Sequence, residues 1–304
     1  MRFGKLEGLL RSARALAAGL SVFVAVGCGG APSPDAGSPT PANTTPATGQ
    51  TTSPAEGMMG TLSEESFKAL HQLTGDKAPA PRGERVTIDG TSAYLSLPKG
   101  KTAPLPGLIV IHEWWGLNEH IQHWTDRLAE DGYAALAVDL YGGKTAKTPD
   151  EAMAMMKAVD NKKAMATLVA AHDFLEKDPR IQAKRTGVIG WCFGGAWSLQ
   201  LAMHEPDLDA SVIYYGHLVT EPAELKPIKA EILGLFGNKD QAIPPETVNA
   251  FDAALTQAGV PHTIYRYDAQ HAFANPSQPR YDEKSAADAW DKVRAFLRKR
   301  LASE

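Results

Sequence analysis

The sequence predicts an α/β domain with a mostly parallel central sheet and helices on both faces. Strand-like and helix-like stretches alternate from about residue 84 to the end of the 304-residue chain, the order expected of such a sheet. Several strand-like stretches are continuously apolar, as strands buried on both faces are. Residues that begin or end helices, such as Asn118 and Gly132, stand between the stretches.

The elements can be assigned in order along the chain. Residues 85–98 alternate polar and apolar side chains around Asp89-Gly90, which predicts a hairpin with a tight turn. The sequence pattern predicts further strands at 107–113, 133–140, 186–190, 209–216, 230–237 and 262–268. It predicts helices at 118–132, 150–176, 196–204, 245–259 and 286–301, the third of them directly after a glycine-rich turn.

The N-terminal segment differs from the rest of the chain. Basic residues precede the short apolar run 15–27, which describes a secretory signal peptide and is too short to span a bilayer. The run ends in "AVGC", which resembles a bacterial lipobox, so Cys28 is a candidate lipidation site. We therefore expect a signal peptide over 1–28 and a lipoprotein anchored outside the cytoplasm. Plain export, or a cytoplasmic helix, is the alternative.

Composition divides the remainder of the chain. Residues 29–57 are rich in Pro, Ser, Thr, Ala and Gly and offer little to bury, so we expect a disordered tether. A helical extension is expected over 58–83, and the α/β domain over 84–304. The net charge of −4, without a basic run in the domain, gives no reason to expect a nucleic acid partner.

One short stretch carries a candidate nucleophile. In "GVIGWCFGG" (187–195), Cys192 follows a strand and precedes a helix, with Gly190 and Gly194 two residues to either side. This spacing is typical of a nucleophile elbow, whose turn has no room for side chains at the flanking positions and aims helix N–H groups at the substrate. A simple tight turn is the alternative. Cys192 is also the only cysteine left if Cys28 is lipidated or removed, which excludes an internal disulfide.

An elbow nucleophile needs a base and a group that orients the base. After Cys192, the next acid at a strand end is Asp240 and the next such histidine is His271, in the expected chain order. Taken alone, each would be an ordinary turn or loop residue. Together they predict a Cys192–His271–Asp240 triad.

Residues at other strand ends complete the candidate site. Glu113 and Trp114 follow the strand 107–113, in the loop that supplies the second oxyanion N–H in this arrangement, while Phe193 supplies the first. A surface carboxylate is the alternative for Glu113. Tyr215 and His217 are candidates for the substrate pocket from their strand-end position alone.

The motifs "HEWWGLNEHI", "GWCFGG", "GNKD" and "QHAF", in this order and spacing, resemble the dienelactone hydrolase family of the α/β-hydrolase superfamily. The resemblance covers roughly residues 84–302 and implies the α/β-hydrolase fold. It implies that Cys192 is the nucleophile, that His271 is general base and acid, and that Asp240 orients it. It also implies that Glu113 contacts the resting thiol. The reaction it implies is hydrolysis of an enol-lactone.

Two positions depart from the family pattern. Asn275 stands where the dienelactone enzymes have an arginine that holds the substrate carboxylate, and we assign Asn275 to the pocket. Residues 141–170 contain lysines but no second arginine, and the two side chains bind carboxylates differently.

The sequence therefore predicts a hydrolase that cleaves a small-molecule ester or lactone through a thioester. A general carboxylesterase or thioesterase, and a non-catalytic surface-anchored binding protein, are the alternatives. No cofactor is expected. No metal is expected either, because His120 and His123, one helical turn apart, lack a third ligand. The oligomeric state stays open, with a monomer acceptable.

Overall fold

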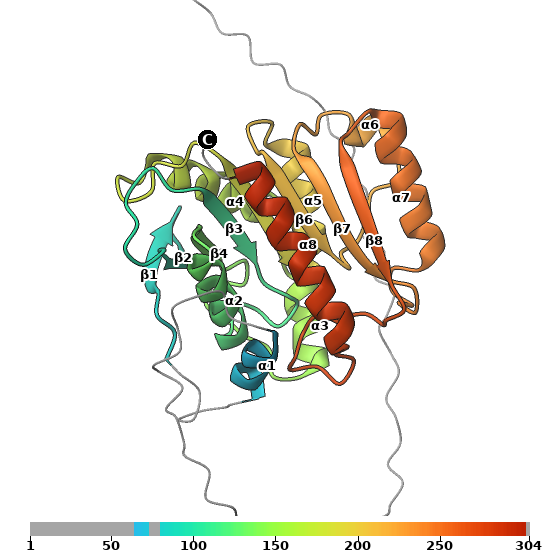
Figure 1. Cartoon of the computed structure of the whole chain (residues 1–304), viewed down its shortest axis with the longest axis horizontal. Coiled ribbons are helices and arrows are strands. Elements are labelled where there is room, and N and C mark those ends of the chain that lie inside the picture. Colours follow the sequence, from blue (N-terminus) through green and yellow to red (C-terminus); the bar gives the residue numbers. More distant parts are fainter. Residues whose placement is uncertain (1–63, 73–79, 302–304) are drawn as a thin grey trace, which may run out of the picture. The chain divides into compact units, whose positions relative to one another are not determined.

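The computed structural model describes residues 64–72 and 80–301 (Figure 1). Its strands are β1 (Glu84–Ile88), β2 (Thr91–Ser96), β3 (Gly107–Ile111), β4 (Ala134–Val138), β5 (Thr186–Trp191), β6 (Ala210–Tyr214), β7 (Glu231–Gly237) and β8 (His262–Tyr267). Its helices are α1 (Glu64–Gln72), α2 (Glu119–Glu130), α3 (Pro149–Lys157), α4 (Asn161–Lys177), α5 (Phe193–His204), α6 (Pro222–Leu225), α7 (Pro245–Ala258) and α8 (Glu283–Leu301).

All strands of the described part join one sheet in the order β1-β2-β4-β3-β5-β6-β7-β8. The strands from β3 to β8 run parallel, and the hairpin β1-β2 is antiparallel and joins the edge at β4. The predicted hairpin and the predicted mostly parallel sheet are thus confirmed. Parallel strands place their carboxyl ends at one edge, so the loops that follow β3 to β8 meet there.

Helices cover both faces of this sheet, as the sequence predicts. Figure 1 shows α2 and α8 in front of the strands and α4 and α5 behind them. Alternate residues of one strand serve the two sides: Leu108 and Val110 pack in the cluster with α2 and α8, while Ile109 and Ile111 pack in the cluster with α4, α5 and α7. Every side chain of β3 is therefore buried, which explains its continuous apolar sequence.

The long helix expected over 150–176 is two helices. Helix α3 ends at Lys157, and Ala158 is its C-cap. Asp160 begins α4, because its carboxylate accepts hydrogen bonds from the backbone N–H groups of Lys162 (2.9 Å) and Lys163 (3.1 Å). The helix-forming composition of this stretch concealed a capping aspartate that restarts the helix in a new direction. Helix α5 also begins earlier than expected, directly at Phe193.

Only part of the N-terminal region is described. Helix α1 lies within the expected extension, and Phe67 is fully buried, with its ring 4.2 Å from that of Trp124 and 4.3 Å from the Arg127 guanidinium carbon. The expected signal peptide, Cys28 and the tether 29–57 lie outside the described residues. Among the described helices, none combines the length and the apolar character needed to cross a membrane.

Candidate active site

Cys192 occupies a strained turn between β5 and α5. Its backbone angles, φ 54° and ψ −113°, lie outside the regions that residues other than glycine ordinarily adopt. The turn is tight: a Cβ on Gly190 would overlap the Gly194 backbone, and a Cβ on Gly194 would overlap the carbonyl of Ile111. The two flanking glycines are therefore required by close backbone contact. The side chain of Cys192 remains partly exposed at the start of α5.

His271 and Asp240 form a hydrogen-bonded pair beside this turn. His271 Nδ1 donates to Asp240 Oδ2 at 2.7 Å, and the other oxygen of Asp240 accepts the N–H groups of Ala242 (2.8 Å) and Ile243 (3.0 Å). Asp240 is 2% exposed, so its carboxylate is held in one orientation. Burial by itself lowers the pKa of His271, but the adjacent Cys192 and the Asp240 carboxylate outweigh it and raise this pKa well above its usual value. A cationic imidazole is thereby favoured beside the cysteine.

Glu113 is buried close to the same histidine. Burial raises the pKa of Glu113 to about 7, although the hydrogen bond from Asn275 and the charge of His271 oppose the shift. Asn275 Nδ2 donates to Glu113 Oε2, and Asn275 Oδ1 accepts from the backbone N–H (2.9 Å) and the hydroxyl (2.6 Å) of Ser277. Both ends of the Asn275 amide are thus occupied. The sequence assigns Asn275 to the substrate pocket, and the structure adds that its amide holds the Glu113 carboxyl.

His112 is hydrogen-bonded to the backbone of the Glu113 loop, a role that sequence reasoning missed. Its Nδ1 donates to the carbonyl of Glu113 at 2.6 Å, and its Nε2 accepts the N–H of Leu140 at 3.2 Å. The two bonds assign the neutral Nδ1–H tautomer, and burial keeps the pKa of His112 below its usual value. In the sequence, only the position of His112 next to Glu113 pointed to this role, because a single sequence does not show which of two adjacent side chains faces the interior.

Phe193 and Trp114 come from the two segments that flank Cys192, as expected. Phe193 is the first residue of α5, whose backbone N–H has no partner within the helix. Its ring stacks on His112 at 5.6 Å. Trp114 is the third residue of the loop after β3 and is partly buried, with its ring 5.1 Å from that of Trp115.

The two remaining pocket candidates differ in burial. Tyr215 is fully buried, has a positive φ of 36°, and lies with its ring 5.1 Å from that of His271. Burial, and then the charge of Glu113, raises the pKa of Tyr215 well above its usual value. Its hydroxyl has no hydrogen-bond partner among the described residues. His217, two residues further on, is exposed. Tyr215 is therefore buried beside His271, whereas the side chain of His217 is exposed.

The geometry can be compared with known proteins. The model of the dienelactone hydrolase family matches residues 91–301. Protein usf of Aquifex pyrophilus is 36% identical over 217 residues, 68% of this chain and 93% of that protein. A Salmonella typhimurium protein named "Putative carboxymethylenebutenolidase" is 33% identical over 220 residues, 67% of this chain and 81% of that protein.

Solved structures agree with this assignment. A dienelactone hydrolase-like promiscuous phosphotriesterase from metagenomic libraries superimposes with a TM-score of 0.65 at 26% identity, over 73% of this chain and 98% of that one. A Klebsiella pneumoniae structure titled as a dienelactone hydrolase gives a TM-score of 0.66 at 31% identity, over 72% and 99% of the two chains. The α/β-hydrolase fold expected from the sequence is confirmed. The chain belongs to the dienelactone hydrolase family and is a hydrolase of the carboxylic ester class.

Proposed function

We propose that this protein hydrolyses a small ester or lactone through a Cys192–His271–Asp240 triad and a thioester intermediate. The observation that carries the proposal is the pairing of a strained elbow cysteine with a histidine whose Nδ1 is held by a buried carboxylate 2.7 Å away. With Nδ1 occupied, the other ring nitrogen of His271 is the one available to Cys192. A purely structural cysteine would need none of these features.

The reaction then follows in two steps. The Cys192 thiolate attacks the carbonyl carbon, a C–S bond forms, and the C–O bond breaks as His271 gives its proton to the leaving alkoxide. Water next attacks the thioester and gives a proton to His271, and the C–S bond breaks to release the acid. In this scheme the backbone N–H groups of Phe193 and Trp114 bind the oxyanion in both steps.

Glu113 is a positioning residue for the thiol in this scheme. It is buried and lies close enough to His271 for their charges to interact. Glu113 and Cys192 also both lie close enough to Tyr215 for their charges to raise its pKa. The raised pKa of Glu113 allows it to take up or give up a proton near neutral pH, which is the range in which a thiol is converted to a thiolate. This assigns it to the control of the ionisation of Cys192.

The natural substrate is less narrowly defined than the chemistry. Relatives carry the name carboxymethylenebutenolidase, which favours an enol-lactone. However, Asn275 replaces the arginine that the family uses for the substrate carboxylate and is committed to Glu113. A general carboxylesterase or thioesterase is therefore the second candidate. A panel of lactones, aliphatic esters and acyl thioesters separates the two by relative kcat/KM.

We also propose that the protein is exported and anchored through Cys28, on the basis of its N-terminal sequence. Metabolic labelling with a radioactive or alkyne fatty acid tests the anchor: incorporation should disappear in the Cys28→Ser variant. Incorporation that persists in this variant would contradict lipidation at Cys28, and absence of label in both would leave plain export as the explanation.

The central experiment measures hydrolysis of p-nitrophenyl acetate by the Cys192→Ala variant. Activity should be abolished while the circular dichroism spectrum is unchanged, and Cys192→Ser should retain little activity because a hydroxyl is the weaker nucleophile here. Full activity in Cys192→Ala would refute the proposal. Iodoacetamide should also label the native protein rapidly near pH 7, and slow labelling would favour the non-catalytic binding protein.

A further inference from the structure

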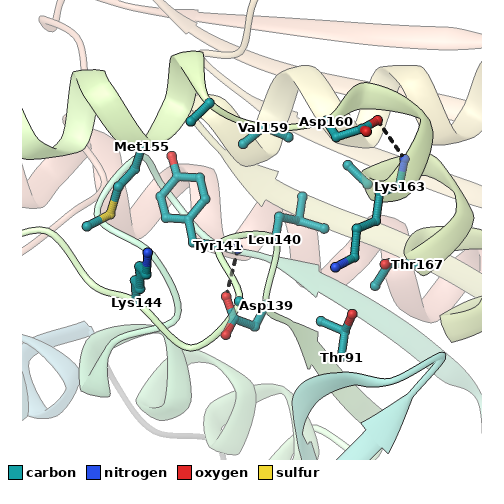
Figure 2. A pocket seen from close by; sticks show the side chains of 13 residues that line it. Thr91, Asp139, Leu140, Tyr141, Lys144, Met155, Val159, Asp160, Lys163 and Thr167 are labelled. Atoms are coloured by element: carbon teal, nitrogen blue, oxygen red, sulfur yellow. Dashed lines mark hydrogen bonds between the residues drawn. The ribbon is translucent and has the colours of Figure 1, made fainter.

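A cavity of about 320 Å³ opens at the carboxyl end of β4, apart from the triad. Its walls come from the first residue of β2, from the segment that follows β4, and from the end of α3, the α3–α4 junction and the first turns of α4 (Figure 2). None of Cys192, Asp240 and His271 lines it. The triad therefore does not account for this cavity.

The carboxylates and the ammonium groups that line this cavity differ in their hydrogen bonding. The carboxylate of Asp139 accepts the backbone N–H groups of Tyr141 (2.8 Å) and Gly143, and that of Asp160 caps α4. By contrast, the ammonium groups of Lys144 and Lys163 form no hydrogen bond or ion pair with any described residue. Backbone N–H groups thus already hold the two carboxylates, whereas the two ammonium groups have no partner in the described part of the chain and can bind an anion.

Two threonine hydroxyls add neutral hydrogen-bonding groups at one end. Figure 2 shows Lys163 extending toward Thr167 and Thr91. Both threonines are largely buried, with 3% and 8% exposure, and neither hydroxyl has a hydrogen-bond partner among the described residues. An ammonium group and two hydroxyls at one end of a cavity provide donors for the two oxygens of a carboxylate.

The rest of the wall is apolar. Leu140, Met155 and Val159 line it together with the ring of Tyr141. Tyr141 is nine-tenths buried, and its hydroxyl has no partner among the described residues. Because a buried hydroxyl without a partner is unfavourable, this side of the cavity is also not fully satisfied by the protein alone.

We propose that this cavity is a second binding site, for a small carboxylate with an apolar body. The carboxylate binds at Lys163, Thr167 and Thr91, and the apolar body lies against Leu140, Val159 and Met155. Carboxylic acids are the product class of the proposed hydrolysis, but binding here does not depend on the chemistry of Cys192.

The site is also coupled to the catalytic centre through one residue. The ring of Tyr141 lies 5.4 Å from that of Phe193, which follows Cys192, and 4.7 Å from that of His112. Tyr141 is close enough to Cys192 for charge on the thiol to raise its pKa, after the larger effect of burial. An occupant of the cavity thus contacts a side chain that packs on the elbow.

The test is a binding titration on the full-length protein with Cys192 blocked by iodoacetamide, so that the catalytic site is closed. Hexanoate, hexanamide and inorganic phosphate are compared by isothermal titration calorimetry or ligand-observed NMR. Hexanoate should bind at least fivefold more tightly than hexanamide and more tightly than phosphate. Lys163→Gln should weaken hexanoate binding by about twofold to fivefold, as expected for the loss of one charge-assisted contact from an exposed lysine.

Lys162→Gln is the matched control, because Lys162 is the neighbouring exposed lysine of α4 and does not line the cavity. It should leave hexanoate binding unchanged. Equal effects of the two substitutions, equal affinity for hexanoate and hexanamide, tighter binding of phosphate, or no binding would each overturn the proposal. Loss of ester hydrolysis in Cys192→Ala is measured separately, so failure of the catalytic proposal would leave this result unaffected.

Discussion

The side-chain amide of Asn275 donates a hydrogen bond to the buried carboxyl of Glu113, with Nδ2 and Oε2 2.5 Å apart. Ser277 fixes the direction of that amide, because it donates twice to the amide oxygen and so turns the NH₂ group toward Glu113. A neutral donor stabilises a carboxylate less than a cation does. Burial therefore still raises the pKa of Glu113 to about 7, although the Asn275 hydrogen bond and the positive charge of nearby His271 both lower it.

Removal of this donor should raise the pKa of Glu113 further. In Asn275→Leu the Glu113 carboxylate loses its hydrogen bond, so the protonated form of Glu113 becomes relatively more stable. The midpoint of the Glu113 titration therefore moves to higher pH. The pH dependence of Cys192 alkylation and the carboxyl ¹³C resonance of Glu113 both measure this shift. His271 and Tyr215 are the titratable groups that face Glu113. Ser277→Ala should give a smaller shift in the same direction, and Ser277→Thr should restore the native profile. An unchanged midpoint in Asn275→Leu would contradict the assignment.

Glu113 should also make stability depend on pH. Its pKa is about 7 in the folded protein and 4.5 in the reference state, so the folded state loses stability as pH rises from about 4.5 to 7. Glu113→Gln removes this term, and should be more stable than the native protein by on the order of 3 kcal/mol at pH 8, with no such gain near pH 4.5. Urea denaturation at the two pH values measures it, with Glu176→Gln on the exposed face of α4 as control. A pH-independent difference would argue against a buried ionisation.

The elbow should not tolerate a side chain at Gly194. An alanine Cβ there would overlap the carbonyl of Ile111 and come within 2.7 Å of that of His112, and neither backbone group can yield easily. We expect Gly194→Ala to lower the free energy of unfolding by about 3 kcal/mol or more. Ala196→Gly in the same helix should cost only about 1 kcal/mol. If the two variants unfold at the same urea concentration, the turn at Gly194 has room for a methyl group and the prediction is wrong.

Asp240→Asn should inactivate the enzyme without unfolding it. The Asn oxygen can keep the N–H groups of Ala242 and Ile243, which turns the new NH₂ group toward His271 Nδ1. An NH₂ group and an Nδ1–H group cannot hydrogen-bond to each other, because both are donors. The ring proton of His271 therefore moves to Nε2, the nitrogen that must accept the proton of Cys192. By analogy with serine proteases, kcat for p-nitrophenyl acetate should fall by roughly 10³- to 10⁴-fold. Near-native kcat with an unchanged circular dichroism spectrum would exclude Asp240 as the orienting residue.

The order of strands and helices follows from hydrophobic periodicity and capping residues, which lie within each element. The candidate triad followed from the same reading, because Cys192, Asp240 and His271 each come directly after a strand, and parallel strands end at one edge. The break between α3 and α4 was missed, since one aspartate decides it and the residues on both sides favour helix.

The sequence by itself determined the α/β fold, the family and the strand ends at which the candidate catalytic residues stand. Only the tertiary structure decided what those residues contact. Asn275 and Glu113 are 162 positions apart, and the lining of the β4 cavity comes from segments that extend from Thr91 to Thr167. Such contacts depend on how the strands are ordered and how the helices pack, which no local pattern records. For this reason the sequence could not show that Asn275 holds Glu113.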